Sequence, residues 1–429
     1  MLELLSPAGN TEKLEAAIRF GADAVYAGFE DLSLRAAGLS LEEIAEGVAF
    51  CHQAGKKFYL ALNIFAFNED IKRVEKVLPE LERLKIDALI ISDPGLIALV
   101  KEKSPSINIH LSTQANTTNW KSAEFWYQQG VSRLVLAREL SIEEIREIKQ
   151  KVPKLELEMF VHGAMCMAFS GRCMLSNYLT GRNANCGDCA QPCRWEYGLV
   201  ELDPKREVSS LPDESNVCTH SGIAESDLTI GETQRGVYIM NSRDLCLIEH
   251  LQKIHEAGVD SVKIEGRMKP AYYVALTAKC YREAIDRVLT CAEDSSGAQN
   301  MQMPEYLYAE LQNVSHRPFT EGFFVSGKNE EMQRYESSKY IRPYDFVGMV
   351  SAYEKGRVYI DARNKIEKGE EIEFLDPQIE ISDIRKIKVN KIINQKDGQE
   401  IPSAHNSYKI IIECPETVSE GTIVRKRVM

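Results

Sequence analysis

The first 160 residues repeat one pattern, in which a short apolar run is followed by a polar turn and then by an amphipathic stretch with helical spacing. The apolar runs lie at residues 2–5, 24–26, 57–63, 87–93, 107–114 and 132–138. Most of the helical stretches begin near Ser, Thr, Asp, Asn or Pro, which are the residues that start helices. Regular alternation of strand and helix predicts parallel strands joined by crossover helices.

Two further apolar runs complete the series. One lies at residues 155–163, and the other lies at 259–267, after an interrupted stretch and a predicted helix at 242–258. Eight strand-helix units close naturally into a (β/α)8, TIM-like barrel. An open, doubly wound α/β sheet is the alternative, and it is disfavoured because no GxGxxG turn follows any of the runs.

The pattern changes near residue 344, where short β-rich runs separated by turns replace the strand-helix units. Six such runs, without helices between them, predict a small β-barrel. The predicted organisation is therefore a TIM-like barrel over residues 1–325, with a Cys-rich insertion at about 164–240, and a C-terminal β-barrel domain over 340–429.

Composition narrows the class of protein. With 44% hydrophobic and 27% charged residues the chain is expected to be globular. The N-terminus lacks the basic and apolar stretches of a secretory signal, and no run approaches the length of a membrane span, so we expect a cytoplasmic protein with no membrane partner. A net charge of -12 argues against indiscriminate nucleic-acid binding, but it is compatible with a shaped RNA site.

Cysteines gather in one window. Of eleven in the chain, five lie within residues 166–193: Cys166, Cys173, Cys186, Cys189 and Cys193. Because cytoplasmic thiols stay reduced, this clustering indicates a metal or iron-sulfur site rather than disulfides. Structural zinc sites usually have two pairs of cysteines, each separated by two to four residues, and only the part of the window from Cys186 to Cys193 has such short spacings. An iron-sulfur site is therefore favoured, with zinc and reduced thiols as alternatives. The other six cysteines are expected to be buried small side chains or free thiols.

Polar residues that end the predicted strands are candidate site residues, because a parallel barrel gathers its chemistry at that end. They include Arg138, His162, Lys263, Glu265 and Arg267. Four others, Ser6, Asn63, Asp93 and Gln114, can line a pocket or simply cap the following helix. Two arginines converging on the mouth of a barrel suit a ligand that carries carboxylates.

Residues 156–197 resemble the peptidase U32 family, formerly described as collagenase-like. The likeness rests on His162-Gly163, on Cys166, on the Ser-Gly-Arg-Cys run at 170–173 and on Leu175-Ser176, and it continues in segments such as 4–9, 21–28, 92–95, 238–242 and 263–267. The members that the chain resembles most hydroxylate the wobble uridine of tRNA to 5-hydroxyuridine, with prephenate as the hydroxyl source. The resemblance also implies a [4Fe-4S] cluster held by Cys166, Cys173, Cys189 and Cys193, with Cys186 a departure from the pattern.

Roles for the remaining candidates follow as expectations. Arg138, Arg267 and Lys263 suit the two carboxylates of prephenate, while Glu265 and His162 suit proton transfer. Trp195 and, second to it, Tyr197 are candidates for stacking on an extruded base. Lys386, Lys388, Lys391 and the run Arg425-Lys426-Arg427 are candidates for gripping tRNA, or for a merely solvated face.

Two other classes of protein compete with this interpretation. A peptidase would need a nucleophile or a metal, and the sequence has neither HExxH nor GxSxG, although His162 and Cys166 could form a nucleophilic pair. The second competing class is a non-catalytic, zinc-stabilised RNA-binding protein. Family members can occur as pairs, so a paralogous U32 partner is a further expectation.

Overall fold

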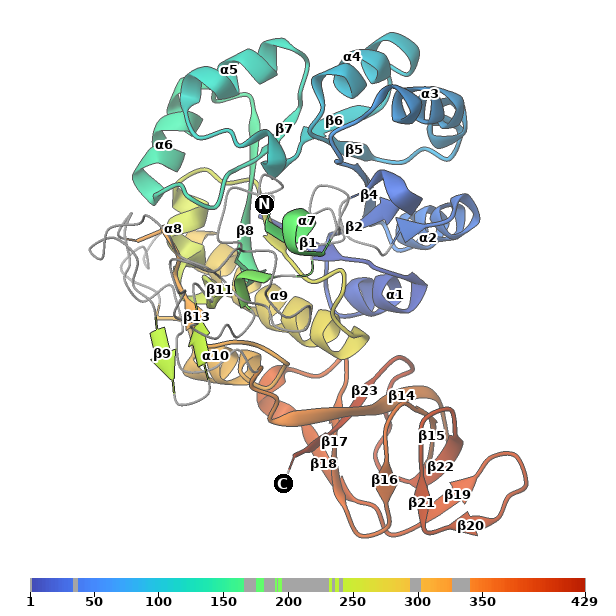
Figure 1. The fold of residues 1–429 in the computed structure, drawn as a ribbon. Coiled ribbons are helices and arrows are strands. Elements are labelled where there is room, and N and C mark those ends of the chain that lie inside the picture. The colour runs from blue at the N-terminus through green and yellow to red at the C-terminus, as the bar shows by residue number, and fades with distance from the viewer. Residues whose placement is uncertain are drawn as a thin grey trace, which may run out of the picture.

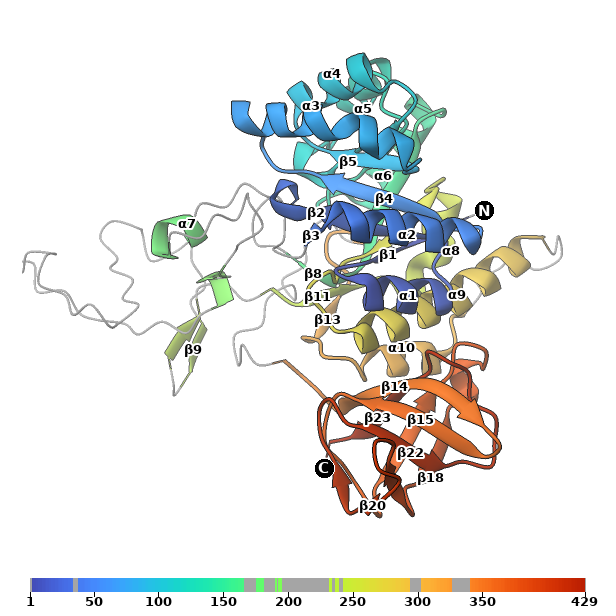
Figure 2. The same cartoon turned by 90° about the vertical axis from the view of Figure 1, so that its right-hand side faces the viewer.

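The computed structural model describes residues 2–33, 38–165, 175–180, 190, 192–194, 231–233, 236–238, 242–293, 302–325 and 340–428. An α/β barrel forms the larger part and a β-domain the smaller, and the β-domain packs beside helices α9 and α10 of the barrel (Figures 1 and 2).

Eight parallel strands close the barrel: β1 (Glu3–Pro7), β2 (Ala24–Phe29), β4 (Lys57–Leu62), β5 (Ala88–Ile91), β6 (Asn108–Leu111), β7 (Arg133–Val135), β8 (Glu156–Ala164) and β12 (Ser261–Ile264). Each pairs with the next, and β12 pairs with both β8 and β1, which closes the ring. The short β3 (Gly38–Leu39) adds to β2. The predicted TIM-like barrel is confirmed, with every predicted barrel strand in place.

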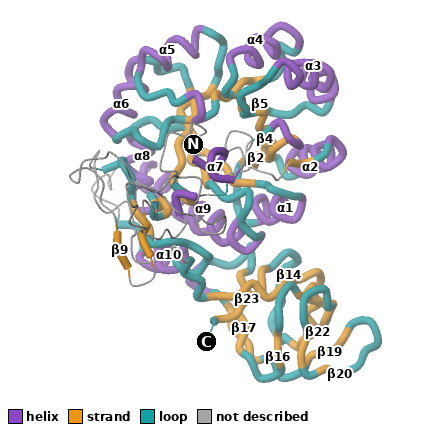
Figure 3. The backbone as a smooth tube through the Cα atoms, viewed as in Figure 1, coloured by secondary structure: helices purple, strands orange, loops and turns teal. Residues whose placement is uncertain are grey.

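Helices form a layer around the strands (Figure 3): α1 (Thr11–Arg19), α2 (Leu41–Gln53), α3 (Asn68–Arg83), α4 (Pro94–Lys103), α5 (Trp120–Gln128), α6 (Ile142–Lys151), α8 (Leu251–Glu256) and α9 (Ala271–Glu293). Their starts follow from local sequence. Ser40 and Ser141 form capping boxes with Glu43 and Glu144, which satisfy backbone donors that the first turn leaves unpaired.

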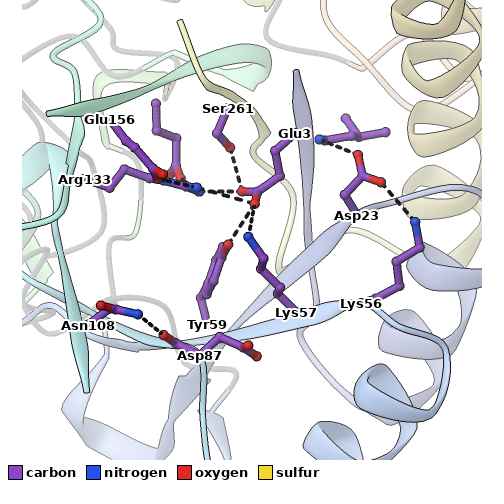
Figure 4. Close-up of polar contacts among 12 residues, drawn as sticks. Glu3, Asp23, Lys56, Lys57, Tyr59, Asp87, Asn108, Arg133, Glu156 and Ser261 are labelled. Atoms are coloured by element: carbon purple, nitrogen blue, oxygen red, sulfur yellow. Dashed lines mark hydrogen bonds and ion pairs between the residues drawn. The ribbon is translucent and has the colours of Figure 1, made fainter. Parts of the chain in front are cut away.

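Buried charges cross the inside of the barrel. Arg133 forms ion pairs with Glu3 and, at 2.8 Å, with Glu156, while Glu3 also accepts hydrogen bonds from Tyr59 (2.9 Å) and Ser261 (3.0 Å) (Figure 4). Burial would raise the pKa of Glu3, but Arg133, together with Tyr59 and Lys57, outweighs this effect and holds that pKa below its usual value. The carboxylate is therefore ionised and paired at neutral pH.

Glu158 connects this network to the opposite end of the barrel. Its fully buried carboxylate lies 3.4 Å from Nη1 of Arg133 and 2.8 Å from Nζ of Lys263. The four strands that carry Glu3, Arg133, Glu158 and Lys263 are neighbours around the closure, in the order β7, β8, β12, β1. The ion pairs therefore join the two ends of the sheet.

We predict that Arg133→Met destabilises the barrel by about 3 to 5 kcal/mol, because it leaves Glu3 and Glu158 buried without their shared cation. Chemical denaturation followed by circular dichroism measures this loss. Lys72→Met is the matched control, since the Lys72–Glu69 pair is exposed on α3 and its loss should cost less than about 1 kcal/mol. Equal losses in the two variants would contradict the structural role of Arg133.

Strand β8 continues past the barrel and pairs with an added strand. From His162 to Ala164 it runs antiparallel to β11 (Asp244–Cys246), which pairs in turn with β13 (Phe319–Thr320). The predicted helix at 242–258 is therefore wrong in its first part: β11 and a 3-10 turn, η6 (Ile248–His250), precede α8. Backbone pairing with the end of β8 overrides the helical spacing there.

Shorter elements accompany the insertion and the end of the barrel. They are α7 (Leu175–Thr180), η4 (Pro192–Arg194), the antiparallel pair β9 (Gly231–Thr233) and β10 (Gly236–Tyr238), and α10 (Glu305–Leu311). Figure 2 shows α7 and β9 on the side of the barrel away from the N-terminus, where the parallel strands end.

The C-terminal domain is an antiparallel sheet in the order β18-β17-β23-β14-β15-β22-β19-β20. The strands are β14 (Tyr344–Glu354), β15 (Arg357–Ala362), β17 (Glu371–Leu375), β18 (Arg385–Lys388), β19 (Ile392–Asn394), β20 (Glu400–Ile401), β22 (Lys409–Glu413) and β23 (Ile423–Arg427), with β16 (Ile366–Glu367) and β21 (Ser403–Ala404) as a separate pair. Among the described residues no pairing joins β18 to β20, so the predicted small barrel is a half-barrel.

Arg425 fastens this half-barrel to the larger barrel. Its side chain, 2% exposed, forms ion pairs with Glu310 of α10 and with Glu373 of β17 (2.7 Å), and donates to the Tyr272 hydroxyl of α9 at 3.1 Å. Leu375, Ile381 and Ile423 join the apolar core of the barrel at the same junction. The barrel core therefore extends into the domain junction, while the half-barrel keeps a separate apolar core of its own.

In the described part of the chain, no helix is both long enough and apolar enough to cross a membrane.

Candidate functional site

Six side chains meet where the barrel strands end, and we call them the mouth cluster: Tyr26, Arg138, Phe160, Lys263, Glu265 and Arg267. Nζ of Lys263 lies 4.3 Å from the ring centre of Tyr26 and 5.5 Å from that of Phe160. Cζ of Arg138 lies 3.9 Å from the Phe160 ring centre, and Cζ of Arg267 lies 5.8 Å from that of Tyr26. Four of the five predicted strand-end residues are thus brought together around two aromatic rings.

Tyr26 links the acidic and basic members of the cluster. Its hydroxyl donates to Oε2 of Glu265 (3.2 Å) and to the backbone carbonyl of Ile264 (3.0 Å). Burial, followed by the negative charge of Glu265, raises the pKa of Tyr26 well above its usual value. The phenol therefore stays protonated and acts as a hydrogen-bond donor that orients Glu265.

Lys263 is buried, with 3% of its surface exposed, as is Arg267, whereas Arg138 is half-buried. Burial lowers its pKa, and the ion pair with Glu158 opposes that shift. The pairing fixes the ammonium between the rings of Tyr26 and Phe160. Lys263 is thereby held as a positioned charge at the floor of the mouth.

The chemistry of the cluster suits an anionic ligand. Three cations, Lys263, Arg138 and Arg267, surround the mouth. Glu158 is shared between Lys263 and Arg133, and the Glu139 carboxylate interacts with Arg138. Guanidinium groups present planar pairs of donors that match carboxylates and phosphates. Arg138 is half-buried, and Arg267, 4% exposed, also lies 3.4 Å from the Ser33 hydroxyl.

Of the other polar strand-end residues, Asp93 has the expected capping role, and the pocket-lining role of the rest stays a prediction. Asp93 caps α4 by accepting from the Leu96 amide at 3.0 Å. Asn63 and Gln114 meet at the Ser112 hydroxyl, at 3.4 Å and 3.3 Å. Ser6 is fully buried in β1.

The imidazole of His162 turns away from the mouth cluster, while its backbone carbonyl accepts a hydrogen bond from the Glu265 amide at 2.9 Å. The pairing of β8 with β12 shifts register between Lys263 and Ile264, and the imidazole packs against Tyr273 and Tyr281 of α9 and against Phe319 of β13. Burial lowers the pKa of His162 to about 3, so the ring is neutral at physiological pH. The structure therefore places the imidazole among the aromatic rings of α9 and β13, and its role in proton transfer stays a prediction.

This burial predicts a pH dependence of stability. An unfolded histidine titrates near about 6.5, so between that pH and 3 the unfolded state binds more protons. The part of the free energy of unfolding that depends on the neutral His162 ring is fully present above about pH 6.5 and is lost as the pH falls toward 3. We predict that wild-type protein loses about 2 kcal/mol through His162 between pH 7 and pH 5, and that His162→Gln abolishes this loss.

Urea unfolding at both pH values measures the difference, and the exposed His405→Gln serves as the control. Parallel pH profiles for wild type and His162→Gln would contradict the prediction.

The cysteine window lies mostly outside the described residues, and so do Cys166, Cys173, Cys186, Cys189, Trp195 and Tyr197. Cys193 is described, half-buried in η4. The Ser176 hydroxyl in α7, three residues after Cys173, accepts from the Ala190 amide, next to Cys189, at 2.9 Å. Chain segments adjoining three of the four predicted ligands therefore come together, and a set of four thiols fits an iron-sulfur cluster or zinc.

Other cysteines follow the expectation for small buried side chains. Cys51, Cys246, Cys280 and Cys414 are buried. Burial raises the pKa of Cys51 and of Cys246 to about 12. Both thiols stay protonated and hence are poor nucleophiles.

The basic residues of the C-terminal domain do not all face solvent. Lys386 and Lys388 are exposed on the edge strand β18, with Nζ of Lys386 2.8 Å from Oε1 of Glu373. The expectation that Arg425 grips RNA is wrong, because that side chain is buried in the domain junction.

Sequence reasoning missed Tyr26, Phe160 and Glu158. A signal was present for Glu158: two glutamates two residues apart in an otherwise apolar strand indicate charges that point into the barrel. It also missed Arg317, which is 3% exposed and donates to the Ser242 carbonyl at 3.2 Å where the chain returns from the insertion.

Fold and site together define a (β/α)8 barrel protein whose mouth is suited to an anionic ligand. The model of peptidase family U32 matches residues 9–334, and that of the peptidase family U32 C-terminal domain matches 342–425. The chain belongs to peptidase family U32.

Its curated relatives carry names of different activities. The tRNA hydroxylation protein P of Haemophilus influenzae is 38% identical, covering 97% of this chain and 94% of that protein. The 23S rRNA 5-hydroxycytidine C2501 synthase of Escherichia coli is 32% identical over 79% of this chain and 48% of that protein. A protein of Porphyromonas gingivalis named collagenase is 33% identical over 86% of this chain and 84% of that protein.

Proposed function

We propose that this protein is a tRNA hydroxylase that forms 5-hydroxyuridine at the wobble uridine, without molecular oxygen and with prephenate as the hydroxyl source. The observation that carries the proposal is the near full-length similarity to a tRNA hydroxylation protein. The similarity to an rRNA-modifying synthase supports the same general activity.

The mouth cluster supports prephenate as the small substrate. Prephenate carries two carboxylates, and Arg138 and Arg267 approach the mouth from the ends of different strands, so that each can bind one of them. Lys263 adds a positive charge below. Glu265, held by the Tyr26 hydroxyl, is the carboxylate placed to exchange a proton with a ligand bound there.

Cys166, Cys173, Cys189 and Cys193 would hold a [4Fe-4S] cluster, which supplies one-electron chemistry when bound. The meeting of α7 with the segment before η4 agrees with such a set of ligands. Zinc remains the alternative occupant, and metal analysis after anaerobic purification distinguishes the two.

RNA contacts complete the proposal. Lys386 and Lys388 are exposed on the edge strand β18, where cations can meet the sugar-phosphate backbone, and Nζ of Lys386 is also paired with Glu373. Trp195, two residues after Cys193, remains the predicted stacking residue near the thiols. A paralogous family member is a candidate partner.

Peptide hydrolysis is the competing activity, favoured by the name of the Porphyromonas gingivalis relative. Its predicted nucleophilic pair needs His162 as a base that turns toward Cys166. In the structure His162 packs against α9, and its Nδ1 lies 3.4 Å from the Tyr281 hydroxyl. Cys166 lies outside the described residues, and the peptidase stays the second candidate.

Deleting the gene and analysing tRNA nucleosides by mass spectrometry tests the proposed function. We expect 5-hydroxyuridine to disappear and to return when the gene is restored. Intact modification in the deletion strain, together with gelatin cleavage by the purified protein, would support the peptidase instead.

We predict that Arg138→Leu lowers kcat/KM for prephenate about 30-fold, which corresponds to about 2 kcal/mol for a lost charged hydrogen bond. Arg138 is a better target than Arg267, because a half-buried side chain can be replaced with less effect on folding than a buried one. Arg83→Leu, at the exposed C-terminal end of α3, is the control. Unchanged kinetics in Arg138→Leu would remove Arg138 from the prephenate site.

A further inference from the structure

Two exposed phenylalanines lie beside the mouth, in the loop that joins β4 to α3. Phe67 has 71% of its surface exposed and Phe65 has 38%, whereas Ile64 between β4 and Phe65 is 4% exposed. Ala66 packs partly against the barrel core. Burial therefore alternates along residues 64–67, which places Phe65 and Phe67 on the same, outer side of an extended segment.

The loop is anchored at both ends. At its start the Ser92 hydroxyl donates to the carbonyls of Asn63 (3.1 Å) and Ile64 (3.3 Å). At its end the Phe67 amide donates to Oδ2 of Asp70 at 2.9 Å, which starts α3. The two rings are thus presented to solvent by a backbone that is already held in place, so little ordering is needed when a partner binds.

The loop adjoins the mouth cluster through charged neighbours. Arg73 of α3 lies 3.8 Å from Glu30 in η1 (Glu30–Leu32), and Ser33, directly after η1, contacts Arg267. The charges nearest the rings are paired with one another: Lys72 with Glu69, and Arg73 with Glu30 and Asp70. These two cations and three carboxylates carry no net positive charge, so contact with the rings themselves is the interaction that this surface offers.

We propose that Phe67, flanked by Phe65, is a stacking platform for an unpaired base of the RNA substrate next to the one delivered to the mouth. This inference rests on the proposed function. Every base has a flat face that stacks on an aromatic ring, and single-stranded loops are where proteins find such bases. Phe65, exposed on the same side of the segment, flanks the position that a base stacked on Phe67 would occupy.

The test compares full-length variants for binding to an anticodon stem-loop RNA that carries a fluorescent base analogue in its loop. Phe67→Ala should weaken binding about tenfold and abolish the fluorescence quenching. Phe67→Trp should retain both. Phe67→Ala keeps the backbone amide that donates to Asp70, so its thermal unfolding should match that of the wild type. Phe125→Ala is the matched control, because Phe125 is 52% exposed on α5 and contacts Trp126.

Salt dependence separates stacking from charge. Removing a stacking ring should leave the slope of log affinity against log salt unchanged, whereas Lys388→Ala should lower that slope if Lys388 contacts a phosphate.

Three outcomes overturn the proposal. If wild type binds the RNA and Phe67→Ala binds it equally well, the platform is wrong and the proposed function stands. If Phe67→Ala changes sedimentation behaviour but not RNA binding, the rings are a protein interface. If wild-type protein binds no RNA, the proposed RNA function falls together with the platform.

Discussion

The carboxylate of Glu158 is the constraint on which the rest of the barrel depends. It is fully buried, and two cations share it: Arg133, from the base of the barrel, and Lys263, at the floor of the mouth. Isolating an ionised carboxylate in such a place costs several kcal/mol, so neither cation can move away without a large loss of stability. The position of Lys263, and hence of the rings around it, is therefore set by the same interaction that joins β7, β8 and β12.

Much of the barrel could be predicted from the sequence, because apolar runs of strand length alternate with capped helices. Strand ends then identified Arg138, Lys263, Glu265 and Arg267, since a closed parallel barrel has one place where strand ends converge. Tyr26 and Phe160 could not be distinguished from core aromatics, because their function depends on which cations lie over their rings. That contact arises only from tertiary packing.

His162 and Arg425 show why pattern alone was insufficient elsewhere. Strict alternation along β8 would place His162 on the same face as Glu158 and Phe160, but a register shift against β12 turns it toward α9. Arg425 belongs to a basic run whose pattern predicts an exposed patch. Its side chain is instead buried in an ion pair with Glu310, which lies 115 positions earlier in the chain. A sequence pattern of charge does not report a partner that is distant along the chain.

Residues Met165 and Ser242, which flank the cysteine insertion, lie close together because β8 and β11 pair antiparallel from Asp244 opposite Ala164 to Cys246 opposite His162. The insertion therefore leaves and re-enters the barrel at one ladder, as a loop closed at its base, and the cost of closing such a loop grows only slowly with its length. The ladder and the barrel ring are made of backbone hydrogen bonds and buried side chains that need no thiolate. The polypeptide can thus reach its native topology without a metal, and the cluster proposed above would be loaded afterwards, as a separate maturation step.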